Sequence, residues 1–168
     1  MYFFASLSQN IAFLFRCLIL EVALTRPLFV YLMEKITVSA LVHADKNLVW
    51  ECYTQPEHIV QWNFADPSWH CPRATNDLRV GGVYNARMEA KDGSFGFDFI
   101  AVYEDIQPKE TLRYVFGDRR AEITFTLKDA GTEVTVTFDP ETENPRELQQ
   151  NGWQSILNNF KAYTENKA

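Results

Sequence analysis

The sequence has few cysteines, and no motif joins them into a site. Cys17, Cys52 and Cys71 are odd in number and widely spaced, and no C-x-x-C pair occurs. Zinc sites and dithiol redox sites of that kind are therefore excluded. The histidines form neither H-x-H nor H-x-x-x-H, so we expect no metal and no cofactor. Unpaired cysteines, together with the lack of an Asn-x-Ser/Thr sequon, favour a reducing compartment and predict a cytoplasmic protein.

Positive charge is also scarce in this chain. The formal net charge is −6. Residues 1–32 carry a net charge of +1, which leaves −7 for residues 33–168. The one adjacent basic pair, Arg119-Arg120, is flanked by acidic residues. Nucleic-acid binding requires a basic surface, so we do not expect a nucleic-acid partner.

No apolar run is long enough to span a membrane. Residues 1–32 are largely apolar, but Arg16, Glu21 and Arg26 interrupt every run of the roughly 20 residues that a spanning helix needs. No basic residue precedes Arg16 and no clear cleavage site follows, which is atypical of a signal peptide. Three interpretations stay open: translated upstream sequence with Met33 as the true start, a membrane-surface helix, or a degenerate signal or anchor. Membrane contact is expected only if this segment is native.

From Met33 onward, the sequence predicts one α+β domain covering residues 33–168. Alternating apolar residues and Gly-containing or Pro-containing turns indicate about seven antiparallel strands joined mostly by hairpins. Asp92-Gly93 is the residue pair of a two-residue type I′ turn. We expect strands at Ile36–Val42, Thr75–Val80, Val83–Ala90, Phe95–Ile106, Thr111–Phe116, Arg119–Lys128 and Thr132–Phe138, with a loop over Phe64–Arg73.

Helices are expected at three places. Asp45 is a good N-cap for a short helix ending near Tyr53, and Pro56 can begin a second one that ends near Trp62. Asn144, Pro145 and Glu147 predict a capping box for a long C-terminal helix. Its apolar stripe contains Leu148, Trp153, Ile156, Leu157 and Phe160.

Four short motifs follow this order of elements: TQPEHI at residues 54–59 ending in Trp62, LRVGG at 78–82, Asp92-Gly93, and Gly152-Trp153. With them, residues 33–165 resemble the START-like (SRPBCC) superfamily, in particular the branch named after the activator of the heat-shock protein 90 ATPase. The resemblance implies a helix-grip fold, in which a curved sheet wraps around the long C-terminal helix. It does not imply the co-chaperone role, which depends on a further domain.

Strand alternation assigns aromatic residues to the side of the sheet that faces this helix. An aromatic inner face under one helix can enclose a binding cavity, although solid packing is the default for proteins. The predicted cavity wall consists of Trp62, Trp69, Tyr84, Met88, Phe97, Phe99, Tyr114, Phe116, Phe125, Trp153, Leu157 and Phe160.

Two polar side chains are candidates for anchors at the cavity mouth. Arg119 shares the inward parity of its strand and is suited to bidentate pairing with a carboxylate or phosphate, or it is an edge arginine bonded to Asp118 or water. His70 can gate the mouth or act as an acid or base, or it stacks on neighbouring aromatics. A His70–Cys71 nucleophile is disfavoured because adjacent residues rarely meet in the required geometry. Arg87, Glu89 and Asp98 have the opposite parity and predict a solvated face.

These features favour a monomer or weak homodimer that binds a small hydrophobic or amphipathic ligand. The alternative is a cyclase-like or hydrolase-like enzyme that uses His70 or Tyr84 with Arg119 in the same cavity. A second alternative is a stress-related, co-chaperone-like interaction module, which requires an exposed apolar patch on the outer face of the sheet or in Phe64–Trp69.

If residues 1–32 are translated upstream sequence, the protein isolated from its natural host will begin at Met33. Intact-mass spectrometry of the natural protein tests this directly. A mass that includes Met1 would overturn this interpretation of the segment.

Overall fold

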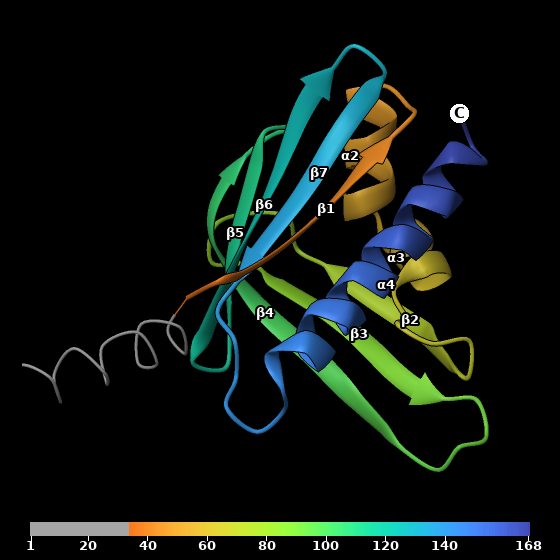
Figure 1. Cartoon of the computed structure of the whole chain (residues 1–168), viewed down its shortest axis with the longest axis vertical. Coiled ribbons are helices and arrows are strands. Elements are labelled where there is room, and N and C mark those ends of the chain that lie inside the picture. The colour runs from red at the N-terminus through yellow and green to blue at the C-terminus, as the bar shows by residue number, and fades with distance from the viewer. Residues whose placement is uncertain (1–33) are drawn as a thin grey trace, which may run out of the picture. The chain divides into compact units, whose positions relative to one another are not determined.

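The sheet and helices are seen in a computed structural model that describes residues 34–168 (Figure 1). The expectations for residues 1–32 lie outside the described residues. Seven antiparallel strands form one sheet in the order β1-β7-β6-β5-β4-β3-β2. The strands are β1 (Ile36–Val42), β2 (Trp69–Asn76), β3 (Val83–Ala90), β4 (Gly96–Gln107), β5 (Thr111–Phe116), β6 (Arg119–Lys128) and β7 (Gly131–Phe138).

Three helices cover one face of this sheet: α2 (Lys46–Thr54), α3 (Pro56–Trp62) and α4 (Arg146–Glu165). The long helix α4 packs against the edge strand β1, and α3 packs against the opposite edge strand β2. Since α3 also contacts α4, the helices connect the two edges of the curled sheet (Figure 1). The predicted α+β helix-grip architecture is confirmed.

The core lies between the inner face of the sheet and the helices. Every second residue of β7 is buried, as expected for a strand with one face toward the core. Among the described residues, the largest side chains with almost no exposure include Phe125, Phe138 and Phe160. The predicted N-cap of α2 is confirmed, because the Asp45 carboxylate accepts the backbone N–H groups of Asn47 and Leu48.

The start of the second strand differs from the prediction. Residues expected to be a loop form most of β2, which begins at Trp69, whereas the residues after Asn76 form a turn. Pro72 reads as a strand breaker, but the pairing of β2 with β3 shifts register between His70 and Arg73. An edge strand tolerates proline at such an irregularity because no ladder hydrogen bond is required of it there.

The β3–β4 turn is not the predicted two-residue type I′ turn. The backbone N–H of Ala90 donates to the carbonyl of Phe95 over 2.9 Å, which closes a longer loop over residues 91–94. Gly93 supplies a φ of 75°, and the Asp92 side chain accepts the N–H of Ser94. The Asp-Gly pair therefore marks the turn correctly, while the loop length depends on strand pairing.

The capping box predicted for α4 is wrong. Pro145 occupies the N-cap position and no side chain caps the helix. Asn144 instead donates its side-chain amide to Glu141. The Gln149 amide donates to the carbonyls of Glu141 and Asn144, which ties the preceding loop to the first turn of the helix.

Three large apolar residues with the inward parity of their elements are exposed. Phe95 lies directly before β4, Leu127 near the distal end of β6, and Leu148, which the sequence placed in the apolar stripe, in the first turn of α4, where it is 59% exposed. Each one continues the periodicity of its element past the region where sheet and helix oppose each other. Periodicity gives the direction of a side chain but not the extent of the covering layer.

Gly131 is required where β7 passes the end of β1. Its φ is 142°, and an added Cβ would lie 2.2 Å from the carbonyl oxygen of Val42. We expect Gly131→Ala to lower the free energy of unfolding by about 3 kcal/mol or more, because strain and overpacking both contribute. Urea unfolding followed by tryptophan fluorescence measures this loss.

Gly93→Ala is the matched control, because Gly93 also has positive φ but open space around it. Its expected cost is about 1–2 kcal/mol, from the left-handed backbone alone. Equal losses in the two variants would show that the close approach at Gly131 has no energetic effect.

Candidate functional site

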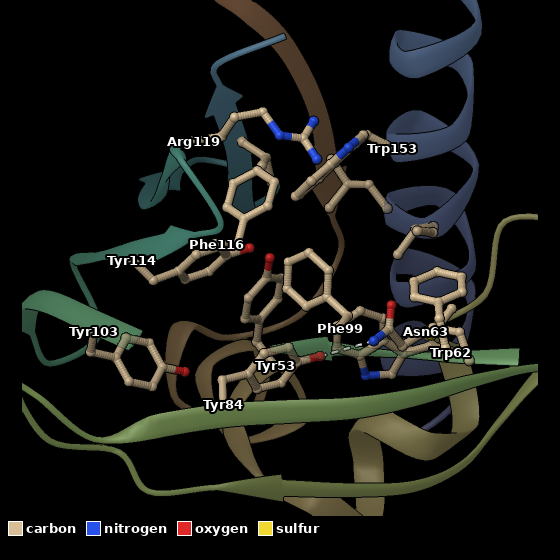
Figure 2. Close-up of a pocket in the computed structure, with 15 residues that line it drawn as sticks. Tyr53, Trp62, Asn63, Tyr84, Phe99, Tyr103, Tyr114, Phe116, Arg119 and Trp153 are labelled. Carbon is tan, nitrogen blue, oxygen red and sulfur yellow. Dashed lines mark hydrogen bonds between the residues drawn. The ribbon is translucent and has the colours of Figure 1, made fainter. Parts of the chain in front are cut away.

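A cavity of about 280 Å³ lies between the inner face of the sheet and α4 (Figure 2). Strands β3 to β7 contribute one wall, α4 contributes the opposite wall, and α2 and α3 contribute the deep end. The lining residues are Tyr53, Trp62, Asn63, Tyr84, Met88, Phe97, Phe99, Tyr103, Tyr114, Phe116, Arg119, Val136, Trp153, Ile156 and Leu157.

Exposure distinguishes the mouth of the cavity from its deep end. Phe97 is 43% exposed, and Arg119 and Trp153 are partly exposed, so these residues border solvent. Trp62 and Asn63, in contrast, are buried. The rim is held in place by Trp153, whose ring stacks on Phe138 with centroids 4.3 Å apart.

Four tyrosine side chains reach the cavity, and they differ in their hydrogen bonds. Tyr84 accepts from the side-chain amide of Asn63 over 2.9 Å, and Tyr103 donates to Asn76 over 3.0 Å. Within residues 34–168, the hydroxyls of Tyr53 and Tyr114 have no protein hydrogen-bond partner. Both rings point into the cavity (Figure 2), so these hydroxyls are available to a bound molecule.

All four phenols are neutral at physiological pH. Burial raises the pKa of Tyr103 to about 12. Burial likewise raises the pKa values of Tyr53, Tyr84 and Tyr114 above the usual range, and the neighbouring tyrosines add to the effect. A neutral phenol keeps its proton and can donate it in a hydrogen bond. The cavity therefore offers donors without negative charge.

Arg119 is the cationic residue of the lining. It pairs in register with Phe116 on β5, and its guanidinium lies 4.6 Å from the centroid of that ring. Within the described part of the chain it makes no ion pair, and no bond to Asp118 is formed. Its charge contributes to the lowered pKa of Glu141, but the larger cause is the hydrogen bond from Asn144 that occupies that carboxylate.

Most of the predicted site residues meet at this cavity, and four do not. Those that line it are Trp62, Tyr84, Met88, Phe97, Phe99, Tyr114, Phe116, Trp153, Leu157 and Arg119. Phe125 and Phe160 are instead fully buried in the core, where both contact Tyr53 edge-on. Trp69 packs beside Phe95 and Phe97, with ring centroids about 6 Å away, and does not line the cavity.

His70 also lies outside the cavity lining. Its ring is partly exposed on β2, with Nε2 3.8 Å from the Glu89 carboxylate. Cys71 is buried, and burial raises the pKa of its thiol to about 11. Because the thiolate is the reactive form of cysteine, this environment does not favour a nucleophile.

Sequence reasoning missed five lining residues. Tyr103 and Val136 continue the inward alternation of their strands, and Ile156 adjoins Leu157 on α4, so a fuller use of periodicity would have included them. Tyr53 and Asn63 lie on α2 and at the end of α3. Trp62 at the end of α3 was the one residue of these short helices that the sequence assigned to the wall, and no sequence signal indicated Tyr53 or Asn63.

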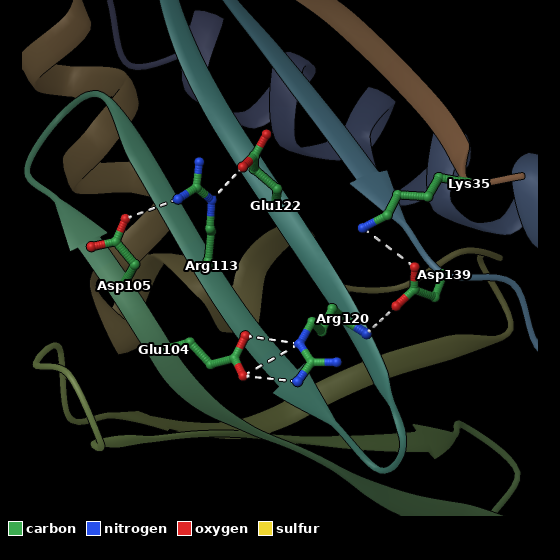
Figure 3. A network of polar contacts seen from close by, with 7 residues as sticks. All are labelled: Lys35, Glu104, Asp105, Arg113, Arg120, Glu122 and Asp139. Carbon is green, nitrogen blue, oxygen red and sulfur yellow. Dashed lines mark hydrogen bonds and ion pairs between the residues drawn. The ribbon is translucent and has the colours of Figure 1, made fainter.

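The outer face of the sheet carries several ion pairs. Arg87 pairs with Glu89 and Asp98, as expected for a solvated face. Further ion pairs join β4, β5 and β6: Arg120 with Glu104, and Arg113 with Asp105 and Glu122 (Figure 3). Beside them Lys35, before β1, pairs with Asp139, after β7, and the Asp139 carboxylate also accepts the backbone N–H of Arg120.

No group of three or more His, Cys, Asp or Glu side chains is placed to hold a metal ion within residues 34–168. The same region has no helix that is both long and apolar enough to span a membrane.

The chain is similar to one protein family and to several solved structures. The profile of the family described as "Activator of Hsp90 ATPase homolog 1-like protein" matches residues 43–165. An AHSA1-like protein from Aeromonas hydrophila shares 38% identity at a TM-score of 0.75, over 79% of this chain and 93% of that one. A protein from Cytophaga hutchinsonii shares 48% identity at a TM-score of 0.69, with the same coverage. Among curated proteins, none is similar enough to count as a match.

The buried phenols predict a loss of stability at alkaline pH. An unfolded tyrosine releases its proton near pH 10, whereas folded Tyr103 keeps its proton until about pH 12. Between these values the unfolded state binds fewer protons, so the free energy of unfolding falls as pH rises. Urea unfolding at several pH values between 10 and 12 measures this slope.

Tyr103→Phe should reduce the steepness of that decline by up to about 1.4 kcal/mol per pH unit, because one titrating group is removed. The lost bond to Asn76 lowers stability by an amount that does not depend on pH. An unchanged slope would mean that Tyr103 titrates normally in the folded protein.

Proposed function

Because this chain belongs to the Activator of Hsp90 ATPase homolog 1-like family of the START-like superfamily, whose members typically bind ligands, we propose that it binds a small hydrophobic or amphipathic molecule between the sheet and α4. This is the same family that the four sequence motifs resemble.

The observation behind this proposal is the aromatic cavity itself. Protein interiors are normally close-packed, so a space of about 280 Å³ under α4 is an unusual feature of the fold. Its volume is at the lower end of the range of small-molecule sites, and its walls combine aromatic rings with a few polar groups. Aromatic walls favour a ligand with an apolar ring system, whereas the phenols and Arg119 favour a ligand that also carries polar groups.

An enzymatic role has less support. No Asp, Glu, His or Cys belongs to the lining, and the four tyrosines have raised pKa values because of burial. The cavity thus lacks a group whose pKa suits proton transfer near neutral pH. Hydrolysis requires an activated nucleophile or an activated water molecule. A cyclase-like reaction in this cavity would instead have to depend on orienting a flexible substrate.

An interaction role has one favourable observation. Val83 pairs with Val102 on the outer face, and both are exposed, as is Ile100 on β4. Ion pairs flank these residues on β3 and on β5. Nothing in the described part of the chain identifies what would cover this face, so ligand binding remains our proposal.

Native mass spectrometry of the full chain, purified without detergent, tests the proposal. We expect a co-purified small molecule, or stoichiometric uptake of the apolar dye N-phenyl-1-naphthylamine by the unliganded protein with a micromolar Kd. Absence of both would contradict the proposed function.

Filling the cavity should weaken this binding. Ile156 lines the cavity from α4, and Ile156→Trp places a larger side chain in the same space. We expect the dye Kd to rise at least tenfold while the far-ultraviolet spectrum is unchanged. Leu148→Trp is the matched control, because Leu148 lies on the same helix outside the cavity. Equal dye binding by both variants would place the bound dye elsewhere.

A further inference from the structure

Arg119 and Arg120 are neighbours in sequence with opposite surroundings. Arg120 points to the outer face, where its Nε lies 3.1 Å from a Glu104 carboxylate oxygen (Figure 3). Arg119 points to the cavity mouth, between Phe116 and Trp153, and forms no ion pair with another described residue (Figure 2). A guanidinium at the mouth of an aromatic cavity, with no ion-pair partner among the described residues, is free to pair bidentately with an anionic group of a ligand.

Tyr114, one of the two tyrosines whose hydroxyls have no protein partner within residues 34–168, lies near this cation on the sheet. Arg119 pairs with Phe116 across β5 and β6, and Tyr114 is one inward step further along β5. Successive inward residues of a strand are about 7 Å apart. Tyr114 is only 7% exposed, yet its hydroxyl has no protein partner within residues 34–168. Among the described residues, only Thr164 Oγ1 is a fully buried side-chain oxygen without a partner, so the Tyr114 hydroxyl borders the open cavity and can donate to a ligand oxygen there.

The charges around the cavity limit the ligand to one negative charge. Arg119 is the lone cation among the lining residues, and no lining residue is acidic. A phosphate monoester would bring close to two negative charges, of which Arg119 can neutralise one. A carboxylate carries one charge and matches the fork of the guanidinium. The aromatic walls then require a flat apolar body between the two polar ends.

We propose that the ligand is a monocarboxylic acid with a flat ring system and a second oxygen at the opposite end. Its carboxylate pairs with Arg119 at the mouth, and the second oxygen accepts a hydrogen bond from the hydroxyl of Tyr114 or Tyr53 inside. This inference rests on the proposed function and specifies the class of molecule that the same cavity takes.

Three probes of nearly the same shape separate the two contacts. 2-Naphthoic acid carries the carboxylate, 2-naphthamide replaces it with a neutral group, and 6-hydroxy-2-naphthoic acid adds an oxygen at the far end. Isothermal titration calorimetry of the full chain gives a Kd for each. We expect wild-type affinity to increase from the amide to the acid and again to the hydroxy acid.

Arg119→Gln should remove the preference for an acid. A hydrogen bond to a charged group is worth enough to predict a loss of about tenfold or more in affinity for both acids, with the amide changed by less than about twofold. Arg119→Lys keeps the charge without the fork and should give an intermediate loss. Arg120→Gln is the matched control, since it changes the net charge equally on the outer face and should leave all three Kd values unchanged.

Tyr114→Phe tests the inner contact. It removes one oxygen that has no protein partner, so the fold should be retained. We expect it to reduce the advantage of the hydroxy acid over the plain acid by about threefold or more, and the double variant with Tyr53→Phe to abolish that advantage.

The possible results distinguish this inference from the proposed function. Binding of the amide as tightly as the acid, or an equal effect of Arg119→Gln and Arg120→Gln on the acid, would overturn the anionic ligand while leaving cavity binding intact. Failure of all three probes and of N-phenyl-1-naphthylamine would contradict cavity binding itself. An unchanged preference for the hydroxy acid in the double tyrosine variant would overturn the inner contact alone.

Discussion

The structure depends on the closure of one curled sheet by helices that join its two edges. Strands β1 and β2 are distant in the sheet, yet α4 packs on β1, α3 packs on β2, and the two helices contact each other. The stacking of Trp153 on Phe138 fixes α4 against the edge of the sheet near β1. Because the sheet is curved and a single long helix packs across it, space remains between α4 and the inner residues of β3 to β7, and this space is the cavity.

The chemistry of the cavity follows from burial. Low dielectric surroundings keep the phenols of Tyr53, Tyr84 and Tyr114 protonated, so the deep end donates hydrogen bonds but carries no charge. The cationic side chain of Arg119 lies where the cavity meets solvent. The site thus has a neutral interior and a cationic rim, which is a polarity suited to recognition and poorly suited to proton transfer.

Much of the fold could be predicted from the sequence because its patterns are local. Alternation in β1 and β7, the Asp45 cap and the stripe of α4 each depend on neighbouring residues. The errors lie where local signals were overridden. Pro72 reads as a breaker but lies at an irregularity of an edge strand, and Asn144 bonds Glu141 instead of capping α4. At Pro72 the pairing with β3 determines the structure. At Asn144 the carboxylate of Glu141, only three residues earlier, competes successfully for the side-chain amide.

The sequence by itself determined the order of elements, the face of each strand that turns inward, and the presence of an arginine among inward-facing residues. Tertiary structure decided which inward residues border empty space and which fill the core. Phe116 and Phe125 have the same inward direction, but Phe116 lines the cavity and Phe125 is enclosed beneath Trp50 and Tyr53. The reason is physical: periodicity specifies direction, whereas a cavity arises from the distance between two packed layers, which no single strand or helix encodes.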